Sequence, residues 1–530
     1  MPSFSLPADL TKDQRFSVLS VAAAVGVAVA VGVATLAVYS TRSRKSEAEA
    51  RGLKEIPVPS GSLPYFGHLL SLGDFPGHQI TKWNQEYGPI IRVNMGVKQW
   101  VMISDPYLAH EIFVTNGSVT SGRPWQLFSH EIYSVNQRGV VFPNPGRRWK
   151  KTRTAALDVL APKNVDRFSD ILDYEADSII ETLLEDSAAN AGLYPVKYFQ
   201  AAAMNVVLTT ILGKRATSMK DPLFLEVVTA VDKGMKFAGV ANDVSSFLPI
   251  LSIMDFLVRK ERNMRNFIKN ERDPLYKRLI KEALESDKDC LLKSLYKLKE
   301  EYELDDTGIL ITINDLIAAG ADTIGVTLSW IVSILCHHPE VQAKMREEVD
   351  AFISAHKRLP TFAERENFPY FISVQKECMR YRPTTPFGLL HEATEDFVVR
   401  GYYIPKGTTL VSNMQGMHLN PDVYPEPGKF IPERFMNNIR TMSAAANSRI
   451  ENRDHYNFGW GRRICPGIHL AEVEIYNVLI RIIAKSVIEP ALDAQGKPQY
   501  PNLDDYLDGG LVTLPNNPRI RFTKRSDALI

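Results

Sequence analysis

The sequence predicts a mainly α-helical protein with a minor β-sheet region, built as a single large domain behind one N-terminal transmembrane helix. Three observations lead to this prediction. Residues 16–39 carry no charge. Between residue 147 and about residue 355, the apolar side chains recur mostly at helical spacing. Short β-branched runs bounded by glycine or proline occur before and after that helical stretch.

The composition excludes several classes of protein. The chain has 530 residues, 45% of them hydrophobic and 23% charged, with a formal net charge of +1. This balance argues against a nucleic-acid-binding protein, which usually has a strong basic excess, and against long disorder. Four cysteines lie far apart without a C-x-x-C pair, so neither a disulfide framework nor a zinc site is expected.

Residues 16–39 are predicted to cross a membrane. As a helix they would be about 36 Å long, enough for a hydrocarbon core of about 30 Å. Arg42, Arg44 and Lys45 follow directly, so the C-terminal side should remain cytoplasmic. A cleaved signal peptide is the competing interpretation, but its apolar core is normally about 7–15 residues. We expect a single-pass protein of the endoplasmic reticulum membrane, in contact with lipid.

The sequence predicts four segments along the chain. Residues 1–15 would be a short lumenal segment, 16–39 the anchor, 40–64 a charged and then proline-rich tether, and 65–530 one catalytic domain facing the cytoplasm. No repeat, dinucleotide fingerprint or phosphate loop is present in that domain.

Local signals predict the elements of the domain in order. A hairpin forms around Gly96, from residues 90–95 and 100–103. A long helix begins near Asp305, which offers a capping side chain, and ends at His338 because Pro339 follows. Further along come a helix at 371–381, strand-like runs at 397–399 and 408–411, and a helix at 470–484.

Residues 458–467 read Phe-Gly-Trp-Gly-Arg-Arg-Ile-Cys-Pro-Gly. Small residues let this backbone approach a large flat partner, the arginines supply positive charge, and a thiolate at Cys465 can bind iron. The segment resembles the haem-binding loop of the cytochrome P450 family, Phe-x-x-Gly-x-Arg-x-Cys-x-Gly, at every fixed position. The resemblance, closest to fungal microsomal members, implies the cytochrome P450 fold and haem b with Cys465 as axial ligand. It also implies cofactor-binding roles for Phe458, Gly461, Arg463 and Gly467, with Arg463 paired to a propionate.

Glu377 and Arg380 are spaced as a helical acid–base pair, which alone usually indicates a solvated surface pair. Together with residues 430–435 (Phe-Ile-Pro-Glu-Arg-Phe) they resemble the family's Glu-x-x-Arg motif and its later Pro-x-Arg-Phe segment. The resemblance implies a buried structural triad of Glu377, Arg380 and Arg434.

The middle of the long helix contains Gly320, Asp322 and Thr323 in the run Ala-Gly-Ala-Asp-Thr. Glycine and threonine are poor choices inside a helix, so a packing kink is one interpretation and function the other. The run resembles the family's oxygen-binding stretch, which implies that Gly320 makes room for dioxygen while Asp322 and Thr323 serve in proton delivery. Ile324 departs from the pattern, because many relatives have a second hydroxyl there.

Other residues match the family's propionate partners. Trp149 and Arg153 resemble its Trp-x-x-x-Arg, and His391 stands where relatives place a further basic group. A histidine there could equally be a satisfied loop residue.

The resemblance implies a monooxygenase that consumes O2 and acts on a hydrophobic small molecule: a steroid, terpenoid, fatty acid or xenobiotic. Without a flavin or nicotinamide motif, the chain must receive electrons from a separate NADPH-dependent flavoprotein reductase. A candidate docking site for the reductase is a cationic cluster formed by Arg147, Arg148, Lys150 and Lys151. The alternative is that these residues are simply the solvated end of a helix. The pocket should draw on mostly apolar segments, 122–141, 237–244, 315–323, 384–390 and 509–513.

Two other functions remain open. One is a haem-thiolate isomerase or dehydratase that needs no external electrons, against which Asp322 and Thr323 argue. The other is a non-enzymatic haem-binding membrane protein, against which the complete oxygen-binding segment argues.

Overall fold

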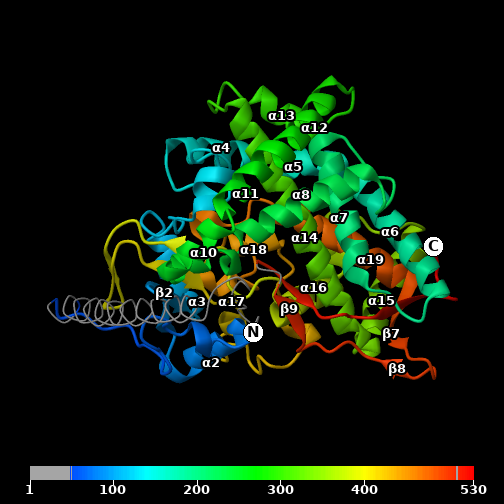
Figure 1. The fold of residues 1–530 in the computed structure, drawn as a ribbon. Coiled ribbons are helices and arrows are strands. Elements are labelled where there is room, and N and C mark those ends of the chain that lie inside the picture. Colours follow the sequence, from blue (N-terminus) through cyan, green and yellow to red (C-terminus); the bar gives the residue numbers. More distant parts are fainter. Residues whose placement is uncertain (1–47, 49–50, 509–510) are drawn as a thin grey trace, which may run out of the picture.

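The computed structural model describes residues 48, 51–508 and 511–530. Figure 1 shows a broad helical layer and, at the left, a smaller region that contains strand β2, with α2 below it. This mainly helical fold with small sheets was predicted from the sequence. The predicted transmembrane helix 16–39 and the first part of the tether lie outside the described residues.

Helices make up most of the domain, and proline or a polar cap starts many of them. The longer ones are α2 (Pro76–Tyr87), α4 (Arg147–Val159), α6 (Ser169–Ala189), α7 (Pro195–Leu212), α8 (Pro222–Ala238), α11 (Lys260–Phe267), α12 (Asp273–Glu285), α14 (Asp306–Cys336), α15 (Pro339–His356), α16 (Pro369–Tyr381) and α19 (Ile468–Lys485). The shorter ones are α3 (Pro106–His110), α5 (Pro162–Val165), α9 (Val244–Phe247), α10 (Ser252–Leu257), α13 (Leu291–Lys297), α17 (Met414–His418) and α18 (Met442–Ala446).

The long helix α14 forms the centre of the helical layer, between α7, α16 and α19 (Figure 1). The carboxylate of Asp305 caps its start by accepting the N–H of Gly308 at 2.6 Å, and the helix ends before Pro339, as predicted. Within the described part of the chain, α14 is the one helix long and apolar enough to cross a membrane. Since 72% of its most apolar window is buried inside the protein, it is a core helix.

The strands form several small sheets. They are β1 (Ile90–Met95), β2 (Lys98–Ile103), β3 (His391–Glu392), β4 (Phe397–Val399), β5 (Tyr402–Ile404), β6 (Thr409–Ser412), β7 (Ser486–Leu492), β8 (Pro498–Gln499), β9 (Tyr506–Asp508), β10 (Thr513–Pro515) and β11 (Ile520–Lys524). The largest sheet has the order β1-β2-β6-β3, in which β2 and β6 run parallel. The predicted hairpin around Gly96 is present; this glycine has φ +58° and no space for a side chain against the backbone of Phe247.

Part of the predicted tether packs against two of these sheets, at β1 and at the turn between β4 and β5. The N–H of Arg92 on β1 donates to the carbonyl of Pro57 at 2.8 Å, and the N–H of Lys54 donates to that of Gly401 at 2.8 Å. Ile56 between them is buried. Proline lacks an N–H but keeps its carbonyl, so a proline-rich segment can still lie along the side of a sheet as an acceptor.

Candidate active site

The cysteine loop connects a short 3₁₀ turn, Gly461–Arg463, to the start of α19. The N–H of Cys465 donates to the carbonyl of Phe458 at 2.9 Å, which closes the loop. Gly461 has φ +51°, and a Cβ there would collide with the carbonyl of Phe113. At Gly467, by contrast, a Cβ would meet no atom within 4 Å. The glycines thus serve two purposes: Gly461 permits a tight backbone approach, and Gly467 leaves open space next to the thiol.

The surroundings of the Cys465 thiol affect its ionisation in opposite directions. Burial raises its pKa, while the N–H of Gly467 and the positive charge of Arg153 act to lower it. The Arg153 guanidinium also donates to the carbonyl of Ile464, next to the cysteine. A backbone N–H and a cation aimed at the sulfur are features that stabilise a thiolate and tune a metal bound to it.

Four basic side chains gather near this loop: Arg123, Arg153, Arg463 and His391. All four are buried, and among the described residues none of them has a carboxylate partner. Burial lowers the pKa of Arg463 to about 8 and that of Arg123 to about 9, with nearby arginines adding to both effects. Burial and Arg123 likewise lower the pKa of His391 to about 3. Buried cations crowded together are costly unless an anion joins them.

The predicted propionate partners thus lie together. The Arg463 guanidinium carbon lies 4.1 Å from the centre of the Trp149 ring, and the Trp149 indole N–H donates to the carbonyl of Val140 at 3.0 Å. His391 is held through Nδ1 by the carbonyl of Thr120 at 2.9 Å. His391 thus lies beside Arg123, as expected for a propionate partner.

Arg123 was not singled out in the sequence. Its guanidinium donates to the carbonyls of Val141, Leu389 and Leu390 at 3.2, 3.1 and 2.6 Å, joining segments far apart in the chain. The one local signal is an arginine between Gly122 and Pro124 in a weakly charged stretch, which does not indicate a partner more than 250 residues away.

The predicted oxygen-binding segment lies on α14. Most of this helix is buried, yet Ala319 and Thr323, one turn apart, are exposed, so they face an open space. The Thr323 hydroxyl donates to the carbonyl of Ala319 at 2.8 Å. The Asp322 carboxylate accepts from the amide of Gln200 on α7 at 3.1 Å. Burial, and then repulsion from Asp232, raise the pKa of Asp322 to about 6, which suits a group that exchanges protons near neutral pH.

Gly320 lies where α14 packs against α7. A Cβ at this position would collide with Val207 on α7. Its missing side chain therefore lets α7 approach α14, and its role in making room for dioxygen stays a prediction. Gly325 acts in the same way, because a Cβ there would lie 2.8 Å from the backbone nitrogen of Gln200.

The triad of Glu377, Arg380 and Arg434 is present and buried. Nε and Nη2 of Arg380 donate to the two carboxylate oxygens of Glu377 at 2.7 and 2.8 Å, and Nε of Arg434 donates to Oε2 at 3.1 Å. Remaining donors of Arg380 bind the carbonyls of His418, Pro427 and Lys429. The triad therefore ties α16 to the chain that leads into the cysteine loop.

The residues present fit haem. A thiol lies in a glycine-lined loop, three buried arginines beside a buried histidine have no carboxylate partner among the described residues, and α14 presents an accessible face at Ala319 and Thr323. A flat macrocycle with two carboxylates would supply the missing anions, and an arginine fork matches a carboxylate well.

Comparison with known proteins agrees with this geometry. The family model for cytochrome P450 matches residues 57–520. Similar curated proteins include cytochrome P450 monooxygenase 79 of Postia placenta, 27% identical and covering 90% of this chain and 91% of its own length. Phenylacetate 2-hydroxylase of Emericella nidulans is 27% identical, covering 92% and 93%.

Solved structures share the fold. A zebra fish cytochrome P450 structure with abiraterone has a TM-score of 0.69 at 23% identity, and covers 86% of this chain and 100% of its own. A zebra fish cytochrome P450 structure with progesterone has a TM-score of 0.70 at 22% identity. This chain therefore belongs to the cytochrome P450 family, whose members use haem b with a cysteine thiolate ligand, and it is a monooxygenase of that family.

Proposed function

We propose that this monooxygenase is anchored in the endoplasmic reticulum membrane, receives electrons from NADPH through a separate flavoprotein reductase, and hydroxylates a hydrophobic small molecule. The observation that carries the substrate class is a cavity of about 300 Å³ with mainly apolar walls. Bound haem supplies the oxygen activation, and the protein orients substrate and delivers protons.

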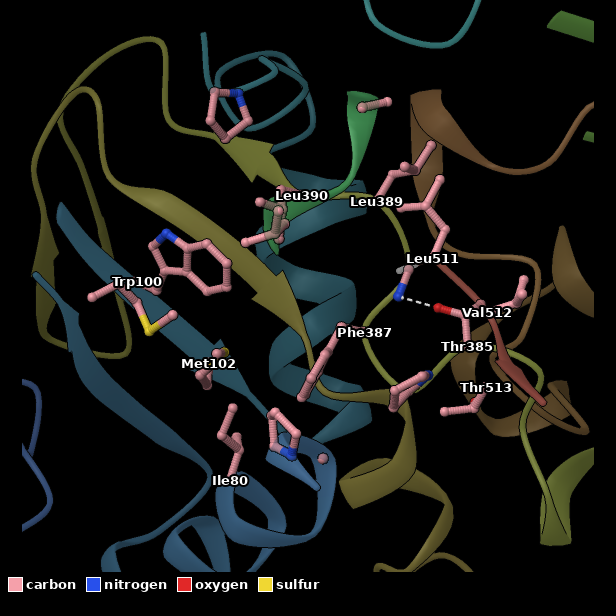
Figure 2. A pocket seen from close by; sticks show the side chains of 18 of the residues that line it. Ile80, Trp100, Met102, Thr385, Phe387, Leu389, Leu390, Leu511, Val512 and Thr513 are labelled. Carbon is pink, nitrogen blue, oxygen red and sulfur yellow. Dashed lines mark hydrogen bonds between the residues drawn. The ribbon is translucent and has the colours of Figure 1, made fainter. Parts of the chain in front are cut away.

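The cavity wall comes from distant segments (Figure 2). Trp100 and Met102 of β2 form one side, and the chain around Leu511 and Val512 forms the other, with Phe387 between them. The loop that carries Phe387 is fixed because the N–H of Gly388 donates to the Thr385 hydroxyl at 2.7 Å. Apolar and aromatic walls favour a substrate with little charge, such as a steroid, terpenoid, fatty acid or aromatic compound. The relative named phenylacetate 2-hydroxylase adds support for an aromatic substrate.

In this proposal Thr323 and Asp322 serve in proton delivery. Thr323 faces the open side of α14, while Asp322 is turned toward α7 and bound to Gln200. With a pKa of about 6, Asp322 can take a proton from water and release it near neutral pH.

Exposed cations on α4 support a reductase docking site. Arg148 and Lys150 are exposed, whereas Arg147 and Lys151 form ion pairs with Glu303, Arg147 at 2.7 Å. The first two are therefore the better candidates to meet an acidic flavoprotein. Arg148→Glu with Lys150→Glu should slow reductase-driven turnover, and Lys281→Glu on α12 is a matched control. Equal rates for both variants would contradict the docking site.

An exposed apolar surface supports the membrane location. It lies around α10, and the chain next to it carries Arg259 and Lys260. The N–H of Ile250 donates to the Tyr65 hydroxyl at 3.1 Å, so this surface adjoins the start of the domain, where an anchor would enter. Its residues are Ile250, Ile253, Met254, Phe256, Leu257 and Val258, and Phe256 is 82% exposed. Extraction of the protein from membranes by alkaline carbonate would contradict the membrane location. Asn116 begins the glycosylation sequon Asn-Gly-Ser, so glycosylation of this residue would contradict a catalytic domain that faces the cytoplasm.

The decisive experiment is the spectrum of the dithionite-reduced, carbon monoxide-treated full-length protein, for wild type and Cys465→Ser. A strongly red-shifted Soret band that the variant loses is expected. Well-folded protein without that band would refute the proposal. Turnover assays with and without NADPH and reductase then distinguish the three functions. A hydroxylase requires both, an isomerase requires neither, and a haem carrier shows no turnover.

A further inference from the structure

The chain between Tyr133 and Val141 lies between α14 and the buried cations. Its last residues form a short strap, residues 139–141, whose N–H groups and carbonyls point to different partners. On the N–H side, the carboxylate of Asp315 accepts from Val140 at 2.7 Å and from Val141 at 3.3 Å. Asp315 lies on α14 and is buried.

On the carbonyl side, the same strap meets the basic cluster. The carbonyl of Val140 accepts from the Trp149 indole at 3.0 Å and from Nη1 of Arg463 at 3.5 Å. The carbonyl of Val141 accepts from Nε of Arg123 at 3.2 Å. Two residues, Val140 and Val141, therefore link one carboxylate to three of the residues that we expect to face the haem propionates.

The carboxylate itself is fixed. Its second oxygen accepts from the Tyr133 hydroxyl at 2.8 Å, and that hydroxyl accepts from the amide of Asn314 at 2.6 Å. Gly139 has φ +92°, and a Cβ there would lie 2.6 Å from Oδ2 of Asp315. The strap can thus sit on the carboxylate only with glycine at this position.

We propose that Asp315 is a positioning residue for haem retention: by binding the N–H groups of the strap it holds Trp149, Arg463 and Arg123 in place to bind the propionates. It touches neither substrate nor haem in this role. The proposal rests on haem binding by this family. Substituting Asp315 should therefore speed haem loss, even though the cysteine loop is unchanged.

The test uses the full-length holoprotein and measures transfer of haem to excess apomyoglobin. Asp315→Asn keeps the shape of the side chain but replaces one carboxylate oxygen by an NH2 group, so it cannot accept the hydrogen bonds of both the strap and Tyr133. Haem loss should therefore be at least about tenfold faster. Gly139→Ala leaves the carboxylate intact but displaces the strap, and should act in the same direction. Tyr133→Phe keeps both strap bonds, so a smaller increase is expected. Asp306→Asn, at an exposed carboxylate of the same helix bound to Lys299 at 2.8 Å, is the matched control.

Hydrogen exchange gives a second readout, because the amides of Val140 and Val141 should exchange faster in Asp315→Asn and not in Asp306→Asn. Haem loss within about twofold of wild type in folded Asp315→Asn, or equal acceleration by Asp306→Asn, would overturn the proposal. If Asp315→Asn does not fold, Gly139→Ala with wild-type haem loss would overturn it instead. A wild type without thiolate-bound haem would refute the proposed function itself, which distinguishes the two failures.

Discussion

Replacing Arg380 by lysine tests whether the buried triad depends on geometry or only on charge. Arg380 makes five hydrogen bonds, two to Glu377 and one each to the carbonyls of His418, Pro427 and Lys429. A lysine ammonium has three donors and no planar fork, so at least two bonds are lost. At about 1.5–3 kcal/mol for a hydrogen bond to a charged group, Arg380→Lys should cost about 3–6 kcal/mol. That is a large share of a net stability of about 5–15 kcal/mol.

The assay is urea unfolding of the full-length protein in detergent, followed by circular dichroism. Arg358→Lys is a matched control, because Arg358 also binds one carboxylate with two nitrogens, at 2.8 and 2.6 Å to Glu364, but at the surface. Solvent already satisfies most of the polar groups there, so little change is expected. An unfolding midpoint of Arg380→Lys equal to that of wild type, or a loss no larger than that of Arg358→Lys, would refute the reasoning.

Three more outcomes are expected. Gly325→Ala places a Cβ 2.8 Å from the backbone nitrogen of Gln200, so it should lower the unfolding free energy by about 1–3 kcal/mol, seen as a lower melting temperature. Burial lowers the pKa of His455 to about 4, whereas the unfolded chain binds this proton near pH 6.5, so the free energy of unfolding should fall by about 1.4 kcal/mol per pH unit between these two values as the pH is lowered. His455→Gln should reduce this dependence in urea titrations at pH 7 and 5.5. Phe387→Ala enlarges the cavity, so optical titration should show tighter binding of bulkier ligands. Unchanged affinity for these ligands would contradict this prediction.

Local chemistry explains which parts of the fold could be predicted. A capping aspartate and a following proline define α14, and a glycine turn defines the hairpin; each signal lies within a few residues of the element it predicts. The packed tether could not be predicted in this way. The bond from Arg92 to the carbonyl of Pro57 depends on a sheet formed later in the chain.

The residues of the candidate site also differ in whether the sequence could predict them. Cys465, Trp149, Arg463 and the triad belong to motifs, so sequence reasoning singled them out. Arg123 and Asp315 belong to no motif, because their partners are backbone carbonyls and N–H groups that any residue could supply. Gly320 was singled out as making room for dioxygen, whereas its close approach to Val207 could not be predicted, because a mid-helix glycine indicates a close approach without saying what approaches.

One segment of α14 fixes the positions of several parts of the candidate site relative to one another. Residues 315–325 span about 15 Å and carry the carboxylate that holds the strap, the open face at Thr323, the Asp322 carboxylate and the glycine packed on α7. If Asp315, Asp322 and Thr323 have the roles proposed above, a change that rotates this segment would disturb haem retention, proton delivery and helix packing together. The described part of the cavity wall, in contrast, includes no residue of α14 and comes mainly from α2, β2, residues 123–142 and the chain near Phe387 and Leu511. If this cavity holds the substrate, as proposed, substrate preference can change through these wall segments without altering α14.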